Sequence, residues 1–464
     1  MRIITNFTLL TTSKFYVFKA PSSSGLGHYP LTVGTRVRLP LGLWFYRRIR
    51  RIMRKILPVL LIGVTLILGV ALRVSFLEIP KRTPDEKFYT AYAREIVSHG
   101  KTATMDMVVA YNFDRMNWVY PPPTRIGYTY LLAGFMKIAH RADERVGTLV
   151  SAGFSILTLF LLVMIGLRFF NPWVTSVALL FLSVSPMDLA VGRRVWQESA
   201  MSFLSAALLF LVAEISARPK NRVLLFLYVL AGSYALLVKE SGTIIFGFFA
   251  GWILWALIFK WKDYKGALFL VLLCLIGAEA DVLLLTWTSG DLRGVWELWK
   301  HVKESMAVNL YATTNQNAPW EEFLKGFWFL SPVTAVFLAA GLIFSIVKRK
   351  EVPLALTCFI VYVFCFLTLF HYFKNIRYAS VMYVPYYLMA GYGFWVMADL
   401  IQGRLKDFAV KSLALGTLIF ILVFSSFLDT RNFDRLFLDK KLQDLTGENI
   451  VKYSIYSKSK PAEN

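Results

Sequence analysis

Long apolar stretches that alternate with short polar segments dominate the pattern of this chain. A membrane-spanning helix needs about 20 mostly apolar residues, and eleven runs meet this length or come close to it. They cover residues 56–77, 146–167, 173–190, 199–215, 223–238, 242–260, 265–288, 326–347, 352–371, 379–399 and 409–428. The pattern therefore predicts an all-α polytopic membrane protein with about 11 transmembrane helices.

A shorter run at 127–139 decides which side of the membrane the later loops face. If it does not cross, four loops lie on the side of the basic N-terminal cluster and hold twelve Lys or Arg residues, against five in the intervening short loops. Lys and Arg favour the cytoplasmic side. We therefore expect 127–139 to be an interfacial helix on the outer surface, anchored by Tyr128 and Tyr130. This puts the N-terminus inside and the C-terminal tail outside.

Two long outer segments, 78–145 and 289–325, follow from this topology. In the second, apolar residues recur at helical spacing, which predicts an amphipathic helix on the membrane surface. Packing on that surface is the simpler interpretation, and covering a bound substrate is the alternative. The apolar residues concerned are Val295, Trp299, Val302, Met306 and Leu310.

The chain divides by composition into three parts. Residues 1–54 form a basic tail, which we expect to be disordered or to precede the true start, since Met53 opens a second plausible beginning. Residues 55–428 form the transmembrane domain. Residues 429–464 form a polar tail, too short for an additional catalytic domain.

Charge and composition exclude several classes of protein. Of 464 residues, 57% are hydrophobic and 17% charged, and the net charge of +22 comes from short clusters between apolar runs. Topology and anionic lipid headgroups explain such clusters better than nucleic-acid binding does. The three cysteines lie inside apolar runs without metal spacing, and the histidines form no HExxH pair. Neither a disulfide framework nor a zinc site is indicated.

Two adjacent carboxylates, Asp85 and Glu86, stand where the chain leaves its first span. Residues 83–86, Thr-Pro-Asp-Glu, form a capping box with proline at the first helical position, which predicts an interfacial helix. That interpretation accounts for Glu86 but does not require Asp85. The alternative is that Asp85 is a base at the membrane boundary, its ionised form favoured by the helix N-terminus.

Other polar residues on the predicted outer side are candidates for the same site. The stretch 118-WVYPPPTR-125 predicts a rigid extended segment in the first outer segment. Lys239 ends an apolar run, where it either reaches the headgroups or binds a ligand. Glu279 and Asp281 lie within a predicted span, where acids usually face a cavity or partner, and we expect a structural ion pair.

Taken together, the motifs PDE (84–86), the aromatic-Pro-Pro stretch, SP…GRRVWQE (185–198), LVKESG (237–242) and NIRYASVMYVP (375–385) resemble the GT-C glycosyltransferases. Within these they are similar to the protein O-mannosyltransferase and aminoarabinose transferase group, over residues 55–400. The resemblance implies transfer of a sugar from a polyprenyl or dolichyl phosphate to an acceptor on the non-cytoplasmic face, in the plasma membrane if the cell is prokaryotic.

The resemblance also implies roles for particular residues. Asp85 corresponds to the catalytic base, and Glu198 to a second acidic position that is often Asp in relatives. Arg377 and Tyr378 correspond to a recurrent Arg-Tyr pair, and a guanidinium suits phosphate. Further candidates for substrate binding are Glu86, Arg193, Arg194 and Lys239. Some relatives bind a divalent cation, for which Asp85 and Glu198 are the candidate ligands; the residues leave metal dependence open.

Two other functions remain compatible with the pattern. A lipid or small-molecule transporter or flippase would place polar residues along a path through the membrane, rather than at one face. A structural membrane subunit would need none of them for chemistry. The acceptor stays open among lipid A, another glycolipid, a polysaccharide and protein Ser or Thr.

Overall fold

The computed structural model describes residues 41–75, 84–308, 321–369 and 376–434. The chain divides into two units, residues 1–53 and 54–464. The described residues of the first unit, 41–53, are helical, so a helix begins before the predicted end of the basic tail at residue 54. All contacts below lie within the second unit.

The described residues form helices and contain no strand, so the predicted all-α class is confirmed. In chain order the elements are α1 (Leu41–Val74), α2 (Pro84–His99), α3 (Lys101–Phe113), η1 (Arg115–Val119), α4 (Ile126–Ile138), α5 (Glu144–Phe169), α6 (Pro172–Ser183), α7 (Pro186–Val191), α8 (Glu198–Ala217), α9 (Arg222–Val238), α10 (Gly242–Trp255), η2 (Ala256–Lys260), α11 (Tyr264–Ser289), α12 (Leu292–Val308), α14 (Glu321–Leu330), α15 (Pro332–Lys348), α16 (Glu351–Leu369), η3 (Ile376–Met382), α17 (Tyr383–Arg404) and α18 (Phe408–Phe433).

Seven described helices are long and apolar enough to cross a membrane, or up to eight if one bent pair counts as a single span. This supports an integral membrane protein, but the predicted count of about 11 is not confirmed. Two predicted spans are interrupted at prolines. The run 173–190 divides into α6 and α7, where Ser185 caps a helix that starts at Pro186. The run 326–347 bends by 119° between Leu330 and Pro332.

Helices α15 and α17 pack closely against each other. A Cβ atom on Gly341 would lie 2.1 Å from the carbonyl oxygen of Met389, and one on Gly393 would lie 1.9 Å from that of Phe337. Only glycine fits at both positions, because the two backbones approach each other directly. The contact fixes the start of α17, which follows directly on η3.

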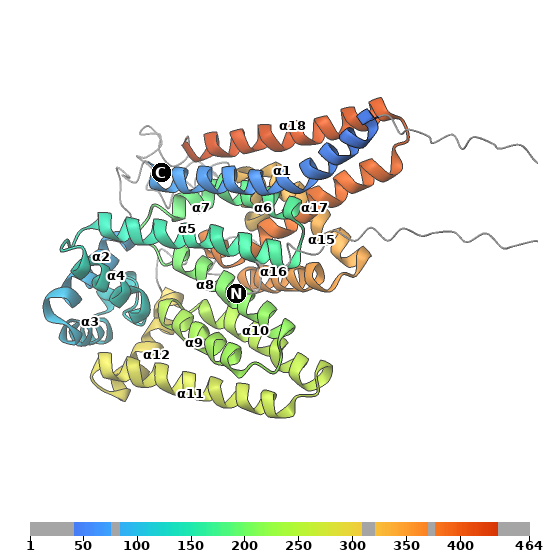
Figure 1. Ribbon diagram of the computed structural model, residues 1–464. Coiled ribbons are helices and arrows are strands. Elements are labelled where there is room, and N and C mark those ends of the chain that lie inside the picture. The colour runs from blue at the N-terminus through green and yellow to red at the C-terminus, as the bar shows by residue number, and fades with distance from the viewer. Residues whose placement is uncertain (1–40, 76–83, 309–320, 370–375, 435–464) are drawn as a thin grey trace, which may run out of the picture. The chain divides into compact units, whose positions relative to one another are not determined.

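The described part of the first predicted outer segment forms three short α-helices, α2, α3 and α4, and the 3₁₀ helix η1. Figure 1 shows them next to one another, and α4 also contacts α5 and α9. The helix predicted at 127–139 is α4, with 13 residues. One part of that prediction is wrong: Tyr128 has no exposed surface. Its ring meets Tyr89 edge to face at 5.4 Å between centroids, so it packs α4 onto α2 instead of anchoring it in the membrane surface.

Helix α12 is the predicted amphipathic helix of the second outer segment. Val295 and Val302 are buried as expected, and the helix contacts α3 and α11. Trp299 departs from that pattern, since 42% of its surface is exposed. The side chain of Met306 and the whole of Leu310 lie outside the described residues.

Candidate active site

The two adjacent acids at the start of α2 point to different partners. Pro84 opens the helix, and Asp85 and Glu86 occupy its first turn; Thr83, the predicted cap, lies outside the described residues. Arg377 Nη2 donates to Asp85 Oδ2 at 3.0 Å, and 27% of the Asp85 side chain is exposed. Glu86 is fully buried. Successive helical residues project about 100° apart, which separates the two carboxylates.

Glu198 opens α8 and is buried against two cations. Lys239 Nζ donates to Glu198 Oε1 at 2.6 Å, and Arg377 Nε lies 3.6 Å from the same oxygen. Lys239 is the C-cap of α9, with extended backbone that turns its side chain out of the helix. Four segments distant in sequence thereby meet in one place.

Aromatic rings support the two cations. The Lys239 ammonium lies 4.3 Å from the centre of the Tyr378 ring, and the Arg377 guanidinium lies 4.8 Å from that of Trp196. Such cation–π contacts stabilise a positive charge that has left bulk water. The charges therefore alternate in the order Asp85, Arg377, Glu198, Lys239. We name these four side chains the charged centre.

A second charged group, which the sequence reasoning missed, adjoins the charged centre. Arg125, the last residue of the PPPTR stretch, donates from Nε to Glu240 Oε1 and Oε2 at 3.2 and 3.1 Å. Arg125 Nη1 also donates to the Tyr89 hydroxyl. Burial alone would raise the pKa of Glu240, but the adjacent Arg125 guanidinium lowers the pKa below its ordinary value. Lys239 and Glu240, which are adjacent in one turn, thus bind different partners: Lys239 binds Glu198, and Glu240 binds Arg125.

Three of the predicted binding residues are buried in contacts within the protein. Arg194 Nη1 donates to Glu86 Oε2 at 2.7 Å, and the backbone N–H of Val195 donates to Glu86 Oε1 at 3.1 Å. Arg193 Nη1 donates to the carbonyl of Leu189 at 2.9 Å. These contacts favour a structural role for Glu86, Arg193 and Arg194, and their contact with a substrate stays a prediction.

A further buried network holds the segment that leads to Glu198. Arg73, in the last turn of α1, is bonded to Asp188 of α7. The Ser155 hydroxyl donates to the same Asp188 carboxylate at 2.6 Å, and Arg73 Nη2 donates to the carbonyl of Leu182 at 3.0 Å. A buried ion pair of this kind fixes geometry more than it adds stability. Nothing in the sequence pattern pointed to it, because Arg73 lies inside an apolar run.

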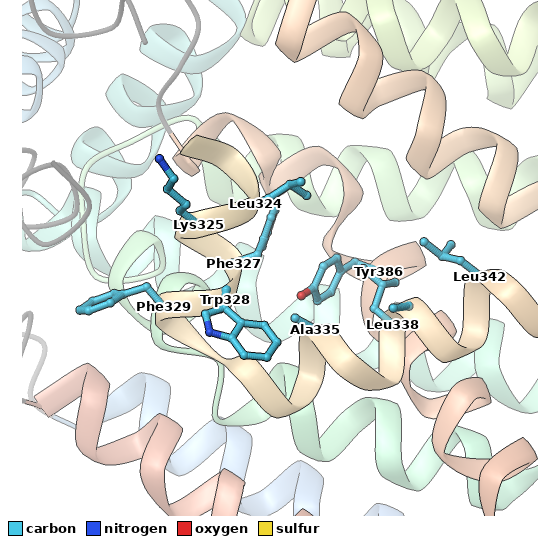
Figure 2. A pocket seen from close by; sticks show the side chains of 10 residues that line it. Leu324, Lys325, Phe327, Trp328, Phe329, Ala335, Leu338, Leu342 and Tyr386 are labelled. Atoms are coloured by element: carbon cyan, nitrogen blue, oxygen red, sulfur yellow. The ribbon is translucent and has the colours of Figure 1, made fainter. Parts of the chain in front are cut away.

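An apolar groove of about 740 Å³ lies where α14 bends into α15, against α17. Figure 2 shows Trp328, Phe327 and Tyr386 around it. Phe327 and Tyr386 also line a small adjoining cavity of about 20 Å³, which Ile376 borders too. Ile376 immediately precedes Arg377 in η3, so the small cavity borders the neighbour of a residue of the charged centre. We name the large groove the α15 groove.

The charged centre does not fit a divalent metal well. Among the described residues, no group of three or more His, Cys, Asp or Glu side chains is placed to hold a metal ion. The two candidate ligands, Asp85 and Glu198, already face the positive charge of Arg377. An added dication would be repelled by this guanidinium and by Lys239.

The two acids within α11 differ in exposure. Glu279 is exposed and Asp281 is partly buried. Within the described part of the chain no salt bridge reaches either one, so the predicted ion pair is not found there. Neither Glu279 nor Asp281 has a role in the proposed reaction.

Comparisons with known proteins bear on the family and the fold. Residues 122–280 match the family model described as dolichyl-phosphate-mannose-protein mannosyltransferase. Among curated proteins, no sequence matches. The oligosaccharyltransferase of Archaeoglobus fulgidus is similar in structure, with a TM-score of 0.56 and 12% identity over 82% of this chain and 56% of that one. This chain thus spans little more than half the length of that enzyme.

Two related structures contain a lipid phosphate. AglB from Archaeoglobus fulgidus, in complex with an inhibitory peptide and a dolichol-phosphate, matches with a TM-score of 0.54 and 12% identity over 82% of this chain and 56% of that one. ArnT from Cupriavidus metallidurans, bound to undecaprenyl phosphate, matches with a TM-score of 0.51 and 14% identity over 86% and 77%. The chain therefore has the GT-C fold, and the resemblance predicted from its motifs is confirmed.

Proposed function

We propose that this chain is an inverting glycosyltransferase that moves a sugar from a polyprenyl or dolichyl phosphate to an acceptor on the non-cytoplasmic face. The observation that carries the proposal is the charged centre. In it one partly exposed carboxylate, Asp85, lies beside Arg377, which also approaches the buried pair of Glu198 and Lys239. An inverting transfer needs one base near the acceptor and cations near the departing phosphate.

Asp85 is the proposed catalytic base, because it is the most exposed of the two acids in the charged centre. Its carboxylate takes the proton of the acceptor hydroxyl as that oxygen attacks C1 of the sugar. The bond from C1 to the phosphate oxygen breaks, and the polyprenyl phosphate leaves with the electron pair. No covalent sugar–enzyme intermediate is needed, and the configuration at C1 inverts.

Arg377 and Lys239 are the proposed binders of the departing phosphate. Negative charge grows on that oxygen in the transition state, and preorganised cations stabilise it there. Glu198 is almost fully buried with Lys239 at 2.6 Å, which leaves it no path to an acceptor proton. We therefore assign Glu198 a positioning role: it holds Lys239 and the Nε side of Arg377 in place.

The α15 groove supports a lipid donor. Its lining is almost wholly apolar, as hydrocarbon requires, and the small cavity that adjoins it borders Ile376, next to Arg377. Two of the similar structures hold dolichol-phosphate or undecaprenyl phosphate, as their descriptions state. A transporter would distribute its polar groups along a path, whereas here they gather in one cluster at helix ends. The outward orientation rests on the distribution of basic loops.

An Asp85→Asn variant tests the proposal. It keeps the side-chain shape but removes the base, so sugar transfer should fall at least about a hundredfold, while binding of undecaprenyl phosphate, measured by photolabelling, stays near wild type. Asp106→Asn, at an exposed acid of the neighbouring α3, is the matched control and should keep full activity. Unchanged transfer by the Asp85 variant would exclude Asp85 as the base.

A further inference from the structure

A second apolar groove, of about 360 Å³, lies between α4, α9 and α11. We name it the α11 groove. Its size lies in the range of about 300–1,000 Å³ that is usual for sites binding small molecules. Its lining includes Ile126, Tyr130, Tyr234, Leu237, Leu284 and Trp287.

The α11 groove opens toward the bilayer. Helix α11 is a candidate span of which only 11% is buried inside the protein. Leu284 and Trp287, at the edge of the groove, are 41% and 53% exposed. Tryptophan is favoured where hydrocarbon meets the headgroups, so Trp287, in the last turn of α11, places the groove at the level of one leaflet.

The hydroxyl groups on the wall are already used within the protein. The Tyr234 hydroxyl donates to the carbonyl of Gly127 at 3.1 Å, and the Tyr130 hydroxyl shares a hydrogen bond of 3.1 Å with Thr104. Thr288 Oγ1 donates to the carbonyl of Leu284 at 3.0 Å. A peptide in this groove would leave backbone N–H and C=O groups without partners, which is costly at membrane depth. A hydrocarbon chain has no polar groups and therefore needs no hydrogen-bond partners.

The inner end of the groove borders the residues that surround the charged centre. Ile126, on its wall, follows Arg125, which is bonded to the Tyr89 hydroxyl. Tyr89 and Asp85 are four residues apart in α2, so their side chains neighbour each other on one face of that helix. Arg125, next in sequence to the groove wall, therefore contacts a residue one helical turn from the proposed base.

The wall formed by α9 also ends close in sequence to the charged centre. Leu237 lies in the last turn of α9, just before Lys239, the C-cap that binds Glu198. The α11 groove is built by α4, α9 and α11, whereas the α15 groove is built by α14, α15 and α17. A residue that borders each groove or its adjoining cavity thus lies within two positions in sequence of the charged centre: Ile376 before Arg377, and Leu237 before Lys239.

We propose that the α11 groove holds the hydrocarbon chain of the acceptor, and that the acceptor is therefore a membrane lipid bearing a free hydroxyl, not a protein or a free polysaccharide. This inference rests on the proposed function. The donor tail occupies the α15 groove. A lipid already anchored in the bilayer can reach the α11 groove by diffusion within the membrane, whereas a soluble acceptor with the same headgroup has no such anchor.

The acceptor class is tested first by where the product goes. Cells carrying the wild-type chain or Asp85→Asn are grown on radiolabelled glucose and separated into lipid extract, protein and polysaccharide. We expect a labelled saccharide that depends on Asp85 in the lipid extract. An Asp85-dependent product on protein or polysaccharide overturns the inference and leaves the proposed function standing. If no fraction changes, the proposed function itself fails.

The groove is tested by two neighbouring substitutions on α11. Leu284→Trp fills the rim of the groove, and Leu283→Trp adds the same bulk at a 61% exposed position that does not line it. With each purified variant in nanodiscs and native lipid extract as acceptor, Leu284→Trp should raise the KM for the lipid acceptor about tenfold, because the indole occupies space that the acceptor chain would fill. Leu283→Trp should leave the KM near wild type. Equal effects of the two variants overturn the inference.

Photolabelling with a benzophenone analogue of undecaprenyl phosphate separates the two grooves. Leu284→Trp should leave the labelling of the protein within about twofold of wild type, because the donor binds elsewhere. Ala335→Trp, in the α15 groove, should reduce it, whereas Val336→Trp, at a 46% exposed position beside it, should not. Loss of labelling in Leu284→Trp would mean that the α11 groove holds the donor, which also overturns the inference.

Discussion

Arg377→Lys separates the geometry of this guanidinium from its charge. Arg377 uses two nitrogens at once: Nη2 donates to Asp85 at 3.0 Å, and Nε lies 3.6 Å from Glu198. A lysine ammonium is a single point and cannot reach both carboxylates from the same backbone position. The variant keeps the net charge of the site but loses one of the two contacts.

The expected loss of activity follows from the lost contact. A hydrogen bond to a charged group contributes about 1.5–3 kcal/mol, which corresponds to roughly 10- to 150-fold in rate if the contact serves the transition state. The effect should lie in kcat more than in KM, because the phosphate gains negative charge as it leaves. Stability should change little, since Glu198 keeps Lys239 and Asp85 remains 27% exposed to solvent.

The assay is sugar transfer by purified protein in nanodiscs, with kcat and KM for the lipid donor measured separately. Thermal unfolding of the same samples excludes a folding defect. Arg349→Lys, at an exposed residue after α15, is the matched control. If Arg377→Lys keeps kcat within about twofold of wild type, the two-nitrogen contact has no part in catalysis and the proposed phosphate site is wrong.

Two further predictions concern the surroundings of the charged centre. Because the pKa of Glu240 is lowered in the folded protein, its pair with Arg125 stabilises the fold above about pH 4, and this contribution is lost as the pH falls through the folded pKa. Glu240→Gln should therefore lower the melting temperature at pH 7 and make it fall less steeply on acidification. Melting temperatures that fall in parallel with pH in the variant and the wild type would contradict this. Glu86→Gln should cost about 3–5 kcal/mol, because it leaves buried Arg194 without its carboxylate. The matched control is Glu95→Gln, at an exposed acid on the same helix, whose melting temperature should stay near wild type. Equal losses of stability in the two variants would refute a buried ion pair at Glu86.

The sequence predicted the apolar helices well and their interruptions poorly. Hydropathy over about 20 residues registers a long apolar run, but a proline inside it does not lower the average. Pro186 and Pro332 both open new helices within runs that look continuous. The first divides a predicted span into α6 and α7, and the second produces the bend that forms the α15 groove. The features that hydropathy could not register are those that build the site.

Candidate residues were predictable where a charge ends an apolar run, and their partners were not. Asp85, Glu198, Lys239 and Arg377 all stand at such ends, on the side that the basic loops assign to the exterior. Their order of pairing depends on tertiary contacts that no local period encodes. Arg125 was missed because a single arginine after prolines is ordinary loop chemistry, and only its contact with Glu240 gives it a role.

At two places, adjacent charged residues pair with different partners, and the proposal assigns a chemical role to one and a structural role to the other. Asp85 faces Arg377 while Glu86 is buried against Arg194, and Lys239 binds Glu198 while Glu240 binds Arg125. In each pair the ion pair of one residue, Glu86 or Glu240, holds the backbone in place and so positions the side chain of the other, Asp85 or Lys239. A chemical group at a helix end has few neighbours to hold it, so the next residue along the chain is the nearest available anchor. This explains why paired charges recur where the chain leaves the membrane, and why substitution of the structural member should reduce stability and activity together.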